Sequence, residues 1–137
     1  MRTYRSVSLI LLVLFAATGI IFLAIPDKVL ILFNSLSVFL KMPSSPVDGR
    51  NFYLILAVGY MYLVTVLAFL MFKRPDNHYF PLLLIHAKLA SSILSLALYF
   101  LEAHRLIYLA NFVIDGVIGV AVLVMYLKMR RREWAYS

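Results

Sequence analysis

The chain contains no cysteine and few charged residues. None of its 137 residues is Cys, and Asp, Glu, Lys and Arg together make up 14%. The lack of thiols excludes disulfides, iron–sulfur clusters and cysteine-ligated zinc. Because a soluble domain carries about 25% charged residues, the low charge argues against a soluble enzyme, a disordered tail and a nucleic-acid-binding domain.

Apolar residues are abundant instead. Hydrophobic residues make up 64% of the chain, and the mean hydropathy is +0.96. The formal net charge of +7 does not require a nucleic acid partner, because cytoplasmic loops of membrane proteins are enriched in Lys and Arg. The composition therefore predicts a small, single-domain integral membrane protein whose basic ends lie against anionic lipid headgroups.

Four apolar stretches are long enough to cross a bilayer, which takes about 20 residues in a helix. They cover residues 7–25, 51–72, 79–101 and 106–127. Residues 28–41 form a shorter apolar run with a small polar patch, which predicts an amphipathic helix on the outer membrane surface. The fold class expected is all-α, an integral membrane antiparallel four-helix bundle with that short helix between the first two spans.

The distribution of basic residues predicts the orientation. With the N-terminus inside, eight of them fall on the cytoplasmic side: Arg2, Arg5, Lys73, Arg74, Lys128, Arg130, Arg131 and Arg132. Four fall outside: Lys28, Lys41, Arg50 and Arg105. Only an even number of crossings gives this agreement with the positive-inside rule. We expect a multi-pass protein of the cell (inner) membrane with both termini cytoplasmic.

Two ionisable residues fall near the middle of the third and fourth spans, Lys88 and Asp115. A charge at mid-bilayer costs roughly 2.5–3.5 kcal/mol on insertion scales. These spans are joined by a short turn, so their polar faces can meet. We expect a polar seam made of Lys88, Ser92, Ser95, Asn111 and Asp115. It is either an ion pair that fixes helix register, a contact with a partner subunit, or a proton, ion or polar-ligand site.

His86 lies on the third span but about 160° around the helix from Lys88, at 100° per residue. It is a candidate haem ligand, proton carrier or packing residue. His104 is roughly 27 Å and His78 about 12 Å away along the helix, so neither can share an iron with His86. No two histidines have the spacing of a helical metal site, and no nucleophile–base pair is evident. We therefore expect no metal and no catalytic residue.

The layout of the whole chain resembles the DoxX-like group of small four-helix membrane proteins, in particular its uncharacterised branch. The features that carry the resemblance are the first span ending at Ile25-Pro26, the short segment at residues 28–41, Asp48-Gly49-Arg50 before a second span with Gly59, and the serine-containing run at residues 87–92. Some members are partner subunits in quinone or thiosulfate oxidation. The resemblance implies an accessory role in electron transfer.

These observations together predict a non-catalytic accessory or anchoring subunit of a larger membrane complex. Its partners would be membrane lipids, other membrane subunits or further copies of the chain, and no nucleic acid. The alternative is a small transporter or a lipid- or quinone-binding protein that uses the Lys–Asp seam. No cofactor is predicted, with haem and quinone as the alternatives.

Overall fold

The computed structural model describes residues 2–45, 50–102 and 104–134, and every regular element in these ranges is a helix. Asp48 and Gly49 lie outside the described residues. The helices are α1 (Arg2–Ala24), α2 (Pro26–Phe39), α3 (Arg50–Lys73), α4 (Tyr79–Leu101) and α5 (Leu106–Trp134).

Four of these helices are long and apolar enough to cross a membrane, which confirms the all-α fold with four spans. The candidate spans are Thr3–Ala24 in α1, Ile55–Lys73 in α3, Tyr79–Leu101 in α4 and Leu106–Arg131 in α5. α1 begins before the apolar stretch predicted for it and α5 continues beyond its stretch, because helical hydrogen bonding persists past the residues that hydropathy detects. α2 is two residues closer to the N-terminus than predicted.

Pro26 separates α1 from α2. Proline has no amide proton and disfavours a helical conformation in the residue before it, and Ile25 has φ −139° and ψ 52°. Pro26 itself fits the first turn of α2, where amide protons lack helical partners anyway. α2 then ends in a Schellman motif. Lys41 has φ 56°, and the Met42 amide donates to the Ser37 carbonyl at 2.8 Å.

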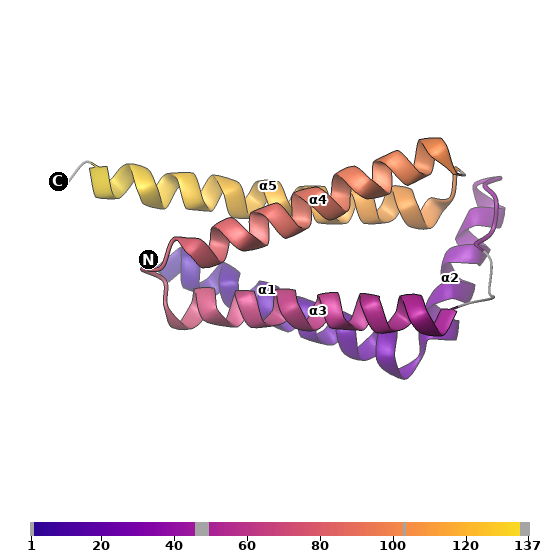
Figure 1. The fold of residues 1–137 in the computed structure, drawn as a ribbon, viewed down its shortest axis with the longest axis horizontal. Helices are drawn as coiled ribbons and strands as arrows, with labels where there is room; N and C mark the ends of the chain where they lie inside the picture. The colour runs from indigo at the N-terminus through magenta and orange to yellow at the C-terminus, as the bar shows by residue number, and fades with distance from the viewer. Residues whose placement is uncertain (1, 46–49, 103, 135–137) are drawn as a thin grey trace.

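α2 lies across one end of the bundle, at a steep angle to the spanning helices (Figure 1). Of the polar patch predicted here, Ser37 is buried and Asn34 half-buried, while Ser35 is exposed. The Asn34 amide group donates to the Ser45 carbonyl at 3.2 Å and accepts from the Ser45 amide at 2.8 Å. The exposed face of α2 is largely apolar and contains Ile31, Leu32, Leu36, Val38 and Phe39.

The spanning helices form two antiparallel hairpins. α1 packs along α3, α4 packs along α5, and the contact between α3 and α4 is less extensive. The start of α1, the end of α5 and the turn between α3 and α4 lie at one end of the bundle, here named the termini end (Figure 1). From that end the hairpins diverge toward the opposite one, the α2 end, where α2 contacts both α1 and α5.

The apolar core occupies the side of the bundle nearer the termini end. It consists of Tyr4, Leu11, Phe15, Val64, Leu67, Ala68, Met71, Leu84, Ile85 and Val122. These residues come from the first part of α1, the last part of α3, the start of α4 and the second half of α5. Those four segments converge at the termini end. The apolar core therefore fills the bundle between that end and its middle.

Candidate functional site

A buried ion pair joins α4 to α5. The Lys88 ammonium donates to Asp115 Oδ1 at 2.7 Å, and the two side chains are only 1% and 4% exposed. A glycine allows the helices to approach here. A Cβ atom at Gly119 would lie 2.9 Å from Leu89 Cδ2 and 3.4 Å from Lys88 Cβ. The structure thus brings together the two ionisable residues that the sequence places near mid-membrane.

Aromatic rings from the other two spanning helices complete the surroundings of Lys88. Its Nζ lies 4.6 Å from the centre of the Phe15 ring on α1 and 5.0 Å from that of Tyr60 on α3. Both distances fall within the range of cation–π attraction, which strengthens when the cation is desolvated. The Tyr60 hydroxyl also donates to the Ala87 carbonyl on α4 at 3.2 Å. Side chains of α1, α3 and α5 therefore surround the ammonium group that α4 carries.

The rest of the polar seam extends from this pair toward the α2 end. The Ser92 hydroxyl donates to the Phe112 carbonyl at 2.8 Å. The Asn111 amide donates to Ser95 Oγ at 2.6 Å and to Ser91 Oγ at 3.1 Å. A Cβ at Gly116 would lie 3.0 Å from Ser92 Oγ, so this glycine also permits close packing of the two helices.

Sequence reasoning did not assign Ser91 to the seam, nor Phe15 to the surroundings of Lys88. Residues 91 and 95 have the i, i+4 spacing of one helical face, so that spacing could have indicated Ser91. No local signal points to Phe15, because its contact depends on how the two hairpins pack. From here the polar seam denotes Lys88, Ser91, Ser92, Ser95, Asn111 and Asp115.

One oxygen of the ion pair is incompletely satisfied. Asp115 Oδ2 is buried and has no hydrogen-bond partner among the described residues. A carboxylate has room for about four hydrogen bonds, and an unsatisfied buried acceptor typically costs about 1–3 kcal/mol, more when it is charged. This oxygen is the group in the seam with capacity for a further hydrogen-bond donor.

His86 is exposed on α4 and lies outside the seam. Its Nδ1 contacts the Leu82 carbonyl at 2.8 Å, so that nitrogen carries the proton. His78 packs edge-on against Tyr126 and His104 against Tyr99, with ring centres 6.3 and 4.9 Å apart. The described residues contain no group of three His, Asp or Glu side chains placed to hold a metal.

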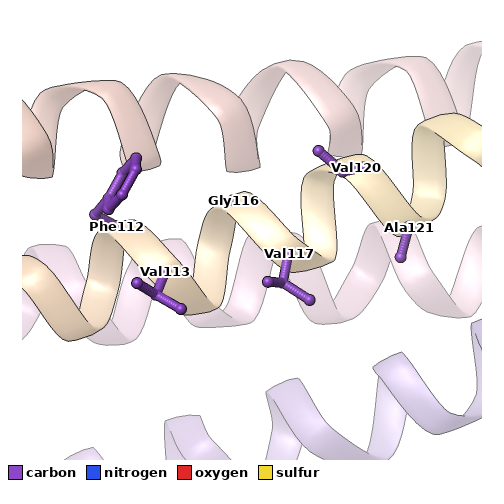
Figure 2. A pocket seen from close by; sticks show the side chains of 6 residues that line it. All are labelled: Phe112, Val113, Gly116, Val117, Val120 and Ala121. Carbon is purple, nitrogen blue, oxygen red and sulfur yellow. The ribbon is translucent and has the colours of Figure 1, made fainter.

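An apolar groove of about 550 Å³ follows the outer surface of α5. It is lined by Phe112, Val113, Gly116, Val117, Val120 and Ala121. Figure 2 shows Val113, Val117 and Ala121 pointing away from α4, whereas Phe112 and Val120 point toward it. The groove thus extends from the side of α5 away from α4 to the contact between the two helices, where Gly116 meets Ser92. Small side chains along such a face allow another membrane-embedded group to approach the backbone closely.

Comparison of the chain with protein-family models, with curated proteins and with solved structures finds no match. The resemblance in layout to the DoxX-like group therefore stays a prediction.

Proposed function

We propose that this chain is a non-catalytic membrane protein that acts as an accessory or anchoring subunit of a larger membrane complex. The observation that carries the proposal is the enclosure of Lys88. Its charge is engaged by Asp115 and two aromatic rings inside the chain, and 1% of it is exposed. An ion pair enclosed in this way holds α4 and α5 in register.

The outer surface supports the assembly role. The α5 groove is wholly apolar in its lining residues and lies within the candidate span Leu106–Arg131. In lipid, close packing rather than hydrophobicity drives helix association, so a spanning helix of another subunit is a suitable occupant. The layout resemblance favours a complex involved in electron transfer.

The test is gentle solubilisation of the tagged chain from native membranes, followed by mass spectrometry and an absorption spectrum. We expect stable co-purification with other membrane polypeptides. Val117 is 64% exposed and lines the groove, whereas Ile114 is 54% exposed on the same helix outside it. Val117→Trp should therefore release the partners and Ile114→Trp should retain them. A wild-type chain that purifies alone or only with itself would refute the proposal.

A second candidate is favoured by the unpartnered Asp115 Oδ2. In this candidate the seam is a proton or polar-ligand site of a small transporter or of a lipid- or quinone-binding protein. A quinol hydroxyl or a lipid hydroxyl has the donor that Oδ2 can accept. The discriminating variant is Asp115→Asn, which keeps the shape of the side chain. It should abolish transport or ligand binding in liposomes while the protein remains folded and inserted.

A further inference from the structure

The buried residues are distributed unevenly along the bundle axis. The apolar core lies on the side of Lys88 nearer the termini end, with Phe15 at the level of the ammonium. Beyond Lys88, toward the α2 end, the residues described as buried on the spanning helices are Ser92, Ser95 and Asp115, which belong to the polar seam. Among the described residues, the buried side chains on the termini side of the ion pair are therefore mostly apolar (Ser8 is a polar one), whereas those on the α2 side are polar.

The side toward the α2 end is polar and less tightly closed. Ser91 and Asn111 are half-buried, and the Asn111 amide donates to the hydroxyl oxygens of Ser91 and Ser95. Hydroxyl and amide groups retain unused hydrogen-bonding capacity, which suits water better than acyl chains.

We infer that water reaches Asp115 from the α2 end only, so that the polar seam is a water-filled half-channel ending at the Lys88–Asp115 pair. Asp115 Oδ2 is the terminal acceptor, since it is buried and has no partner among the described residues. Buried waters are found where two or more polar partners can hold them, and Ser92 and Asp115 are adjacent seam residues on facing helices. The apolar core blocks the route from the termini end.

Four side chains of the described residues form the ion pair and its immediate surroundings. They are Asp115 from α5, Lys88 from α4, the Tyr60 hydroxyl-bearing ring from α3 and the Phe15 ring from α1. The half-channel deepens the second candidate function, because it gives a polar ligand or proton its route of entry. It goes beyond the assembly role and uses a different assay, so the failure of one is distinguishable from the failure of the other.

The lack of native cysteine makes a single-cysteine labelling experiment direct. A thiol reacts as its thiolate, which apolar surroundings disfavour, so the labelling rate reports hydration. Ser95→Cys probes the seam, Val122→Cys the apolar core, and Ile93→Cys the lipid-facing side of α4. Ser44→Cys and Arg130→Cys, both at exposed positions, mark the α2 end and the termini end. Each full-length variant is reconstituted in liposomes and treated from one side with a membrane-impermeant maleimide.

We expect Ser95→Cys to react from the side marked by Ser44→Cys, at least about ten times faster than Ile93→Cys. Val122→Cys should stay unlabelled from both sides. Equal rates at positions 95 and 93 would overturn the inference, because lipid or protein would then fill the seam. Labelling of Ser95→Cys from the side marked by Arg130→Cys would overturn it as well.

Three further variants test the inference in other ways. If Ser95→Cys does not fold, Ser91→Cys replaces it, because Ser91 is half-buried and hydrogen-bonds the same Asn111 amide. Asn111→Leu, added to the seam cysteine, should slow labelling severalfold by removing a polar group from the half-channel. Val124→Leu, at an exposed position of α5 outside the groove, should leave the rate unchanged. A rate insensitive to Asn111→Leu would contradict the proposed route.

Discussion

Lys88 and Asp115 stabilise the bundle only as a pair. Truncating one partner leaves the other charge buried and uncompensated, which typically costs about 3–5 kcal/mol. We predict losses of this size in unfolding free energy for Lys88→Met and for Asp115→Leu. The double variant should be much less destabilised than the sum of the two, because no charge is then left unpaired. Denaturant titration in detergent micelles measures all three.

Thr18→Ala is a suitable control for this cycle. The Thr18 hydroxyl donates to the Leu14 carbonyl of its own helix at 2.8 Å, far from the pair in the sequence and outside its contacts. Its loss should change the unfolding free energy by less than about 1 kcal/mol. Additive effects of Lys88→Met and Asp115→Leu would show that the 2.7 Å contact does not couple the two residues.

Gly119 is predicted to be required for the close approach of α4 and α5. A Cβ at this position already lies 3.2 Å from Leu89 Cγ and 3.4 Å from Lys88 Cβ, and Gly119→Val adds two further methyl groups. Overpacking of this kind costs typically about 1–3 kcal/mol, so the melting temperature in detergent should fall. Gly59→Val is the matched control, since a Cβ there meets nothing within 4 Å. Equal effects at both glycines would contradict this prediction.

At the scale of the helices, the sequence predicts spans well because apolar length and charge placement report directly on the membrane. The pairing of Lys88 with Asp115 follows from their similar depth on consecutive helices joined by a short turn. The contacts of Phe15 and Tyr60 with Lys88 could not be predicted from the sequence. They depend on the packing of one hairpin against the other, which no single-helix pattern encodes.

α2 is predicted to contact lipid through its exposed apolar face. Phe39 is 83% and Val38 69% exposed, and burying such side chains away from water is worth about 1.5–3 kcal/mol each. In a Trp134→Phe background, Phe39→Trp should emit at short wavelength and be quenched by brominated lipids. Lys28→Trp, near the start of the same helix, should be quenched less. Emission at long wavelength from position 39, with no lipid quenching, would place this face in water.

At the scale of the whole molecule, the two ends differ in charge. Among exposed or half-buried side chains, the termini end carries Arg5, Lys73, Arg74, Lys128, Arg130 and Arg131. The α2 end carries Lys28, Lys41 and Arg105. Since Lys and Arg near the ends of spans favour the cytoplasmic side, we propose that the termini end is cytoplasmic and that α2 lies on the outer face.

This orientation predicts the behaviour of reporter fusions, because four crossings return the chain to its starting side and a fifth would not. Green fluorescent protein fused at the C-terminus should fluoresce, since it folds in the cytoplasm, and alkaline phosphatase fused there should be inactive. Fusions after Glu102, at the turn between α4 and α5, should show the opposite pattern.

Neutralising the basic residues after Leu127 should weaken the preference of the C-terminus for the cytoplasm, because the positive charge at the end of α5 would be lost. An active C-terminal phosphatase in the unaltered chain would mean that α2 crosses the membrane or that the whole bundle is inverted, and an N-terminal fusion separates the two. In both cases the Glu102 fusion becomes fluorescent. A fluorescent protein fused at the N-terminus stays bright if α2 crosses while the first residues remain cytoplasmic. It becomes dark if the whole bundle is inverted.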